Sequence, residues 1–200
     1  MPKKTLILII FLALITGGLI YMALTTSSTP STPNQTPTTT TEINQAKPVK
    51  KTAQLSFDPA SLTITSFGSG SAKQTVNIIV KTQGQVVSGA QLELQFDPLS
   101  VTNLTVDAGT DSIFGPSGYF VIPLKVDYQT GRATYAVAVG ATATPKATEG
   151  KVVTVTFTAK KHANLSTSVI AILDKSIVTQ EGTGESILSA EHPLTLHFAQ

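Results

Sequence analysis

The chain has 200 residues, no cysteine and a formal net charge of +2. Without cysteine it has no disulfide framework, thiolate nucleophile or zinc-thiolate site. Five lysines and a single acid, Glu42, precede residue 53, so residues 53–200 carry nine basic and eleven acidic side chains. A nearly neutral, slightly acidic domain lacks the basic surface that binds nucleic acid, and we exclude that class of partner.

Residues 5–24 read TLILIIFLALITGGLIYMAL, without a charge, and follow Lys3 and Lys4. A helix of this length spans roughly 30 Å, the thickness of the hydrocarbon core of a bilayer. The lysines favour a cytoplasmic N-terminus, so residues 1–24 are predicted to be a single-pass cell-membrane anchor with an extracellular C-terminal domain. A cleaved signal peptide is the alternative, although its apolar core is usually only about 7–15 residues long. Either segment exports the rest of the chain.

Residues 25–52 are predicted to be a disordered linker. Their first part, TTSSTPSTPNQTPTTTT, is almost entirely Thr, Ser and Pro. Such a segment has no apolar side chains to bury, and burial is what would offset the entropy lost on ordering. We expect the linker to hold the following domain away from the bilayer.

Residues 53–200 contain short β-rich runs separated by Gly- and Pro-containing turns, and no stretch has a helical apolar period of useful length. The expected strands are 54–57, 61–65, 74–82, 89–96, 100–107, 119–128, 131–140, 151–160, 168–179 and 193–198. A short helical turn is expected within 143–150. This pattern predicts an all-β domain, an antiparallel β-sandwich with jelly-roll topology and about nine strands.

The strand 89–96 shows the clearest alternation. Leu92, Leu94 and Phe96 share one face, which we assign to the core, and Gln91, Glu93 and Gln95 share the other. The strand should end at Asp97-Pro98, because proline has no backbone N–H. The run KVVTVTFTAK alternates in the same way, with Val and Phe predicted inward and Thr outward.

A family resemblance rests on the order of these motifs. The segment VVSGAQLELQFDPLSVTNLTV (86–106), then SIFG (112–115), GRATYAVAVG (131–140) and GKVVTVTFTAK (150–160), resembles a bacterial cohesin domain. The resemblance implies a jelly-roll sandwich with a non-catalytic role. Cohesins bind calcium-loaded dockerin domains and so assemble extracellular enzymes, and the resemblance therefore implies a role in polysaccharide degradation.

The resemblance also implies a binding face. In cohesins the dockerin meets one sheet face, formed partly by the strand that corresponds to 89–96. The positions that match are the outward residues of this strand and their neighbours on the hairpin around Gly131, namely Gln91, Glu93, Gln95, Tyr128 and Thr134. The chain departs from the family pattern at Gly89-Ala90-Gln91, where a polar Asn-x-Asp pair often begins the binding strand, and in the small apolar side chains of 131–140.

Other chemistry has little support in the sequence. His162, His192 and His197 are not accompanied by a nucleophile-elbow pattern, and His197 should be a solvent-facing strand residue. Asp107 and Asp111 could serve acid/base or calcium chemistry, but Asp and Gly at such spacing are typical of turns. We therefore expect no enzyme activity, no cofactor and no metal.

Two further functions remain open from the sequence. One is direct carbohydrate binding, with Tyr119 or Tyr128 as the platform on which a sugar ring stacks. The other is a structural role in the cell envelope, which would require self-association through strand edges.

Overall fold

The computed structural model describes residues 49–65, 71–115, 119–140, 147–160 and 165–199. These residues form twelve strands and no helix. In this part of the chain no helix is long and apolar enough to cross a membrane. The predicted anchor, residues 1–24, and most of the predicted linker lie outside the described residues.

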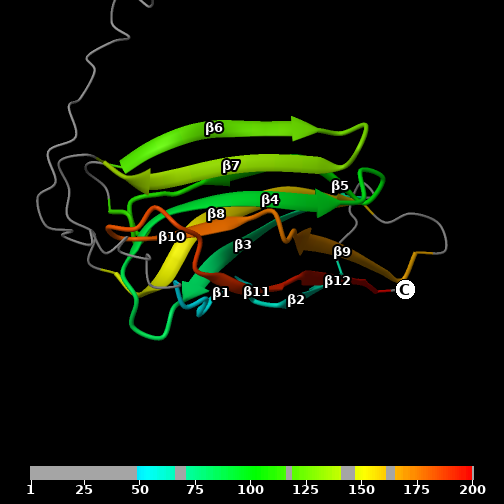
Figure 1. Cartoon of the computed structure of the whole chain (residues 1–200). Helices are drawn as coiled ribbons and strands as arrows, with labels where there is room; N and C mark the ends of the chain where they lie inside the picture. The colour runs from blue at the N-terminus through cyan, green and yellow to red at the C-terminus, as the bar shows by residue number, and fades with distance from the viewer. Residues whose placement is uncertain (1–48, 66–70, 116–118, 141–146, 161–164, 200) are drawn as a thin grey trace, which may run out of the picture. The chain divides into compact units, whose positions relative to one another are not determined.

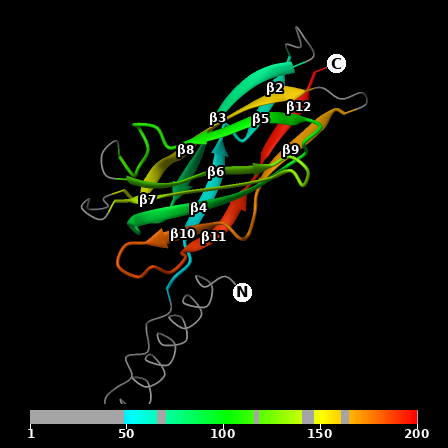
Figure 2. The same ribbon diagram turned by 90° about the horizontal axis from the view of Figure 1, so that it is seen from above.

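The strands form two sheets (Figures 1 and 2). Sheet A has the order β11 (Leu188–His192), β1 (Ala53–Asp58), β3 (Ser71–Lys81), β8 (Glu149–Lys160) and β5 (Val101–Asp107). Sheet B has the order β2 (Ser61–Ile64), β12 (Leu194–Phe198), β9 (Thr167–Ile172), β4 (Val87–Phe96), β7 (Arg132–Val139) and β6 (Tyr119–Asp127), with β10 (Ile177–Gln180) also paired to β4. The prediction of an all-β sandwich is confirmed.

The core lies between the sheets and follows the alternation read from the sequence. On β4, Leu92, Leu94 and Phe96 are at most 2% exposed, whereas the residues between them are partly exposed. The Val and Phe side chains of β8 are buried in the same way. Among the described residues, the buried apolar cluster extends from Ala53 to Phe198. Residues 47–200 cluster as one compact unit.

Two strand pairs are parallel, so the expectation of a wholly antiparallel sandwich is wrong at these places. β1 pairs with β11 in sheet A, and β2 pairs with β12 in sheet B, both in parallel. Pro59 separates β1 from β2, and Pro193 separates β11 from β12. Because proline cannot donate a ladder hydrogen bond, each run leaves one sheet at its proline and continues in the other.

The predicted strand 168–179 is interrupted. Its first part, β9, pairs with Leu94–Phe96 of β4. Its second part, β10, pairs with the preceding half of β4. Between them, Ser176 donates its backbone N–H to the carbonyl of Leu173 in a turn. The strand β11 was not predicted. Of the range in which a short helical turn was expected, residues 143–146 lie outside the described residues, and Glu149 and Gly150 belong to β8.

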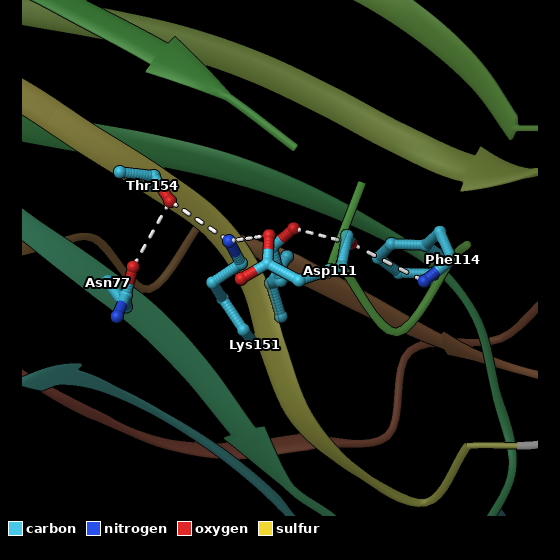
Figure 3. Close-up of polar contacts among 7 residues, drawn as sticks. Asn77, Asp111, Phe114, Lys151 and Thr154 are labelled. Atoms are coloured by element: carbon cyan, nitrogen blue, oxygen red, sulfur yellow. Dashed lines mark hydrogen bonds and ion pairs between the residues drawn. The ribbon is translucent and has the colours of Figure 1, made fainter. Parts of the chain in front are cut away.

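The loop after β5 extends the edge of sheet A. Beyond the end of β5, Ile113 donates its N–H to the carbonyl of Lys151, and Ser112 Oγ donates to the carbonyl of Val152, both at 2.8 Å. Lys151 Nζ forms an ion pair with Asp111 and also donates to Thr154 Oγ1 (Figure 3). Asp111 thus fastens this loop to the sheet, in line with a turn role.

The ion pair gives a pH-dependent prediction. The hydrogen bond from Lys151, and after it a backbone hydrogen bond, hold the pKa of Asp111 below its ordinary value of 3.8. A carboxyl with a depressed folded-state pKa stabilises the fold above its unfolded-state pKa, and this contribution is lost as the pH falls through the lower, folded-state pKa. We expect Lys151→Met to raise the pKa of Asp111 towards 3.8, as measured by NMR titration of its carboxyl carbon.

The matched control for this titration is Asp127. Its pKa is lowered by the hydroxyl of Thr130 and by backbone N–H groups of the β6–β7 turn, with only a minor contribution from Lys125. Its pKa should not respond to Lys151→Met. An Asp111 titration that is the same with and without Lys151 would show that the ion pair is not the cause of the shift.

Candidate functional site

The outer face of sheet B carries four of the five residues predicted for partner binding. The strand register places Glu93 of β4 opposite Thr134 of β7, with Gln91 and Gln95 on either side along β4. These side chains are partly exposed, as the alternation predicted. Figure 1 shows β6, β7 and β4 side by side, so this face is continuous across the three strands.

A hydrogen-bonded network holds the polar part of this face in place. The carboxylate of Glu93 accepts hydrogen bonds from Gln91 Nε2 at 3.0 Å and from Thr134 Oγ1 at 2.7 Å. Gln95 Nε2 donates to the carbonyls of Thr130 and Gly131 at the β6–β7 turn. Since each side chain is held by a neighbour, a partner would meet a preformed surface at this point.

An apolar groove lies next to this network, towards the start of β4. The register aligns Ile122, Ala136, Gln91 and Ile177 in one row across β6, β7, β4 and β10, and aligns Phe120, Ala138, Gly89 and Thr179 in the next. The rows enclose about 270 Å³. We call this groove the apolar trough and define it by its walls and floor: Phe120, Ile122, Ala136, Ala138, Gly89, Ile177 and Thr179.

The shape of the trough follows from side-chain size. Phe120 and Ile122 on β6 are 62% and 52% exposed, and Ile177 on β10 is 36% exposed. Between these walls the floor consists mainly of alanine and glycine. A Cβ on Gly89 would lie 2.9 Å from Thr179 Oγ1 and 3.2 Å from the Cβ of Ala138, so any side chain there would displace Thr179.

The trough was not predicted from the sequence. One available signal was the run YFVI (119–122), in which all four residues are apolar. Successive side chains of a strand point to opposite faces of the sheet. Because one face of this sheet is buried in the core, the apolar side chains on the other face must be exposed to solvent. The small side chains of 131–140 are a second signal, because alanines on the outer phase of a strand leave a hollow between larger neighbours. Neither signal says which strands lie on either side of that hollow.

Tyr128, the fifth predicted residue, does not lie on this face. It follows Asp127, which is paired with the outward Arg132, so the next side chain, that of Tyr128, points away from the outer face. The hydroxyl of Tyr128 accepts a hydrogen bond from the backbone N–H of Leu104 on β5 at 2.8 Å. Its ring and that of Phe96 form an edge-to-face pair, with centroids 5.8 Å apart. Tyr128 therefore lies at the end of the sandwich, where the two sheets meet.

The other residues singled out in the sequence form no reactive cluster in the described chain. His197 is exposed on β12, as predicted, and Asp111 pairs with Lys151. Among the described residues there is no group of three or more His, Cys, Asp or Glu side chains that could hold a metal ion. His162 lies outside the described residues.

Several solved structures share the fold of this chain. The cohesin of OlpC from Clostridium thermocellum, solved in complex with a dockerin, gives a TM-score of 0.58 at 11% identity over 77% of this chain and 97% of that one. The third cohesin of ScaC from Acetivibrio cellulolyticus, in complex with the ScaB dockerin, gives 0.57 at 16% identity over 74% and 99%. At these identities the likeness shows a common fold.

A further match involves a module from an enzyme. The cohesin module of a family 33 glycoside hydrolase from Clostridium perfringens gives a TM-score of 0.51 at 12% identity, over 75% of this chain and all of that one. Comparison with curated proteins finds no match. The cohesin domain family itself matches residues 73–189, from β3 to β11. Since this match spans more than half of the 200 residues, the chain belongs to the cohesin domain family.

Proposed function

We propose that the sandwich is a non-catalytic protein-binding module that captures a dockerin domain through the outer face of sheet B. The observation that carries this proposal is the apolar trough, with Phe120 and Ile122 more than half exposed beside the ordered Glu93 network. Exposed apolar patches rimmed by polar groups mark interaction sites. Membership of the cohesin family supports the choice of partner.

The dimensions of the trough suit a helix of the partner. Three inter-strand spacings of about 4.8 Å separate β6 from β10, which gives about 14 Å between the backbones of the two walls. An α-helix with its side chains is about 10–12 Å across. The floor of Ala136, Ala138 and Gly89 allows a helix to approach the sheet closely, while Glu93 offers an acceptor at one end of the groove.

The edge of sheet B next to the trough favours docking on the face over strand addition. β6 is the outermost strand and contains Pro123, within a register shift between Ile122 and Lys125. Proline and irregular pairing blunt an edge strand, because they interrupt its row of backbone donors and acceptors. This feature argues against the structural role, which would need self-association through such edges.

The test is capture of native partners by residues 47–200. We expect proteins retained from the secreted fraction of the source organism to carry dockerin domains. Retention should be lost when calcium is chelated, because cohesins bind dockerins in their calcium-loaded form and loss of a bound metal can unfold a small domain. Mass spectrometry identifies the retained proteins. A retained set without dockerins, unchanged by chelation, would contradict the proposal.

We also propose that residues 1–24 tether the module to the cell membrane and that the sandwich faces the outside. The uncharged run at 5–24 and the preceding lysines support this placement. The full chain should fractionate with membranes, resist extraction by high salt and carbonate, and be shaved from intact cells by protease. A soluble chain in the medium, with a new N-terminus near residue 25, would instead show a cleaved signal peptide.

A further inference from the structure

A second groove lies at the end of the sandwich, where β4 leads into β5. It encloses about 510 Å³ and is lined by Pro98, Leu99, Thr102, Asn103, Tyr128 and Lys160. None of these residues belongs to the apolar trough. The volume falls within the range of about 300–1,000 Å³ that is usual for small-molecule sites.

An aromatic ring stands at this groove in a fixed position. Tyr128 is 42% exposed, yet its hydroxyl accepts the N–H of Leu104 at 2.8 Å, and its ring packs on that of Phe96 with 69° between the ring planes. Leu99, 61% exposed, contributes an aliphatic surface to the same groove. An exposed ring that cannot rotate away loses little freedom when a flat ligand stacks on it.

Polar groups surround this apolar surface. Asn103 has a φ of +52° within a register shift of β5, and its Nδ2 reaches Thr158 Oγ1 only at 3.4 Å, a long hydrogen bond. The Asn103 amide can therefore bind another group without giving up a strong contact. The Thr102 hydroxyl makes a similarly weak bond, at 3.5 Å, to a β8 carbonyl.

Lys160 brings a positive charge to the groove. Lys160 is its only ionisable lining residue apart from Tyr128, and within the described residues the only ion pair joins Lys151 to Asp111. The carboxylate of Asp97, which precedes Pro98 in the chain, accepts hydrogen bonds from the N–H of Leu99 and the hydroxyl of Ser100 and forms no ion pair with Lys160. The Lys160 ammonium is therefore available to an anionic ligand.

We propose that this groove binds a saccharide unit that carries a carboxylate. One face of the sugar ring stacks on Tyr128 and Leu99, the hydroxyls of the sugar bond to Asn103 and Thr102, and the carboxylate pairs with Lys160. A pyranose presents an apolar C–H face and a rim of hydroxyls, which is the complement of this lining. The site is independent of the partner face and does not rest on the dockerin proposal.

The test is NMR titration of residues 47–200 with trigalacturonate and, as the uncharged match, α-1,4-galactotriose. We expect saturable shift changes at Leu99, Asn103 and Tyr128, with tighter binding of the acidic sugar. Tyr128→Ala should weaken binding at least about tenfold, equivalent to about 1.4 kcal/mol. Lys160→Gln should abolish the preference for the acidic sugar, and Asn103→Gly, which tolerates the positive φ, should weaken both sugars.

Two variants keep the result interpretable. Tyr128→Phe loses the acceptor for Leu104 N–H but keeps the ring, so it should retain most of the sugar affinity. It thus distinguishes loss of the stacking surface from loss of the hydrogen bond that supports the fold. Ala136→Glu, in the apolar trough, should bind sugar like the unsubstituted domain whatever its effect on dockerin. No saturable shifts, or equal affinity in Tyr128→Ala, would overturn the site; equal affinity for both sugars would overturn the carboxylate requirement.

Discussion

Replacement of Gly131 by alanine should strongly destabilise the sandwich, because it adds a methyl group where the backbone of β4 already lies. Gly131 has a φ of +66°, and a Cβ at this position would lie 2.0 Å from the carbonyl oxygen of Phe96 and 3.0 Å from Pro98 Cδ. The same residue accepts the N–H of Phe96 at 2.8 Å, so the turn cannot move without loss of that bond. We expect a loss of about 3 kcal/mol or more, of which the left-handed backbone accounts for about 1–2 kcal/mol.

Urea denaturation of residues 47–200 measures this effect, and Gly182→Ala provides the control. Gly182 has a similar φ of +78°, but a Cβ there meets nothing within 4 Å. The Gly182→Ala variant should therefore lose only the cost of the left-handed backbone, about 1–2 kcal/mol. Equal losses at the two positions would show that the close approach to Phe96 contributes nothing to stability.

Replacement of Ala136 by glutamate should reduce partner binding at least about 100-fold, equivalent to about 2.7 kcal/mol. Ala136 lies in the middle of the trough floor, between Ile122 and Gln91 in the register. A glutamate there fills the groove and places a charge where a docked apolar surface would exclude water. Titration calorimetry with a captured dockerin protein measures the change.

The matched control is Thr156→Glu. Thr156 is an outward residue of β8 on the opposite sheet, partly exposed and paired with Thr75, so it receives the same charge on a comparable strand surface. The affinity of the Thr156→Glu variant for the dockerin protein should stay within about twofold of that of the unsubstituted domain. Surface substitutions away from an interface change stability and binding little. If Ala136→Glu binds equally well, the partner docks elsewhere on the domain.

The sequence predicted well what depends on alternation along one strand. On β4 and β8 the side chains of a strand point to opposite faces in turn, so the apolar set marks the core without knowledge of the neighbouring strands. Leu92, Leu94 and Phe157, which this rule assigns to the core, are buried. The outward positions of Gln91, Glu93, Gln95 and Thr134 follow from the same rule.

The break inside 168–179 shows the limit of that rule. Asp174-Lys175 interrupts the apolar pattern only briefly, and the chain resumes its path along β4 after the turn. The interruption depends on contacts with another part of the chain, because Ser176 Oγ accepts the N–H of Glu93, and Glu93 accepts the N–H of Leu173. A bond between residues 83 positions apart leaves no local mark in the sequence.

By itself, the sequence determined the class of fold and which side chains of each strand face the core, because both depend on side-chain polarity at a spacing of two residues. Only the tertiary structure decided which strands are neighbours, including the parallel pairs β1–β11 and β2–β12. It also decided that Tyr128 accepts a hydrogen bond from Leu104 and so lies away from the partner face. Likewise, it decided that Phe120 and Ile177 line the same groove. The physical reason is that ladder hydrogen bonds join backbone groups common to all residues, so pairing is selected by the packing of the whole sandwich.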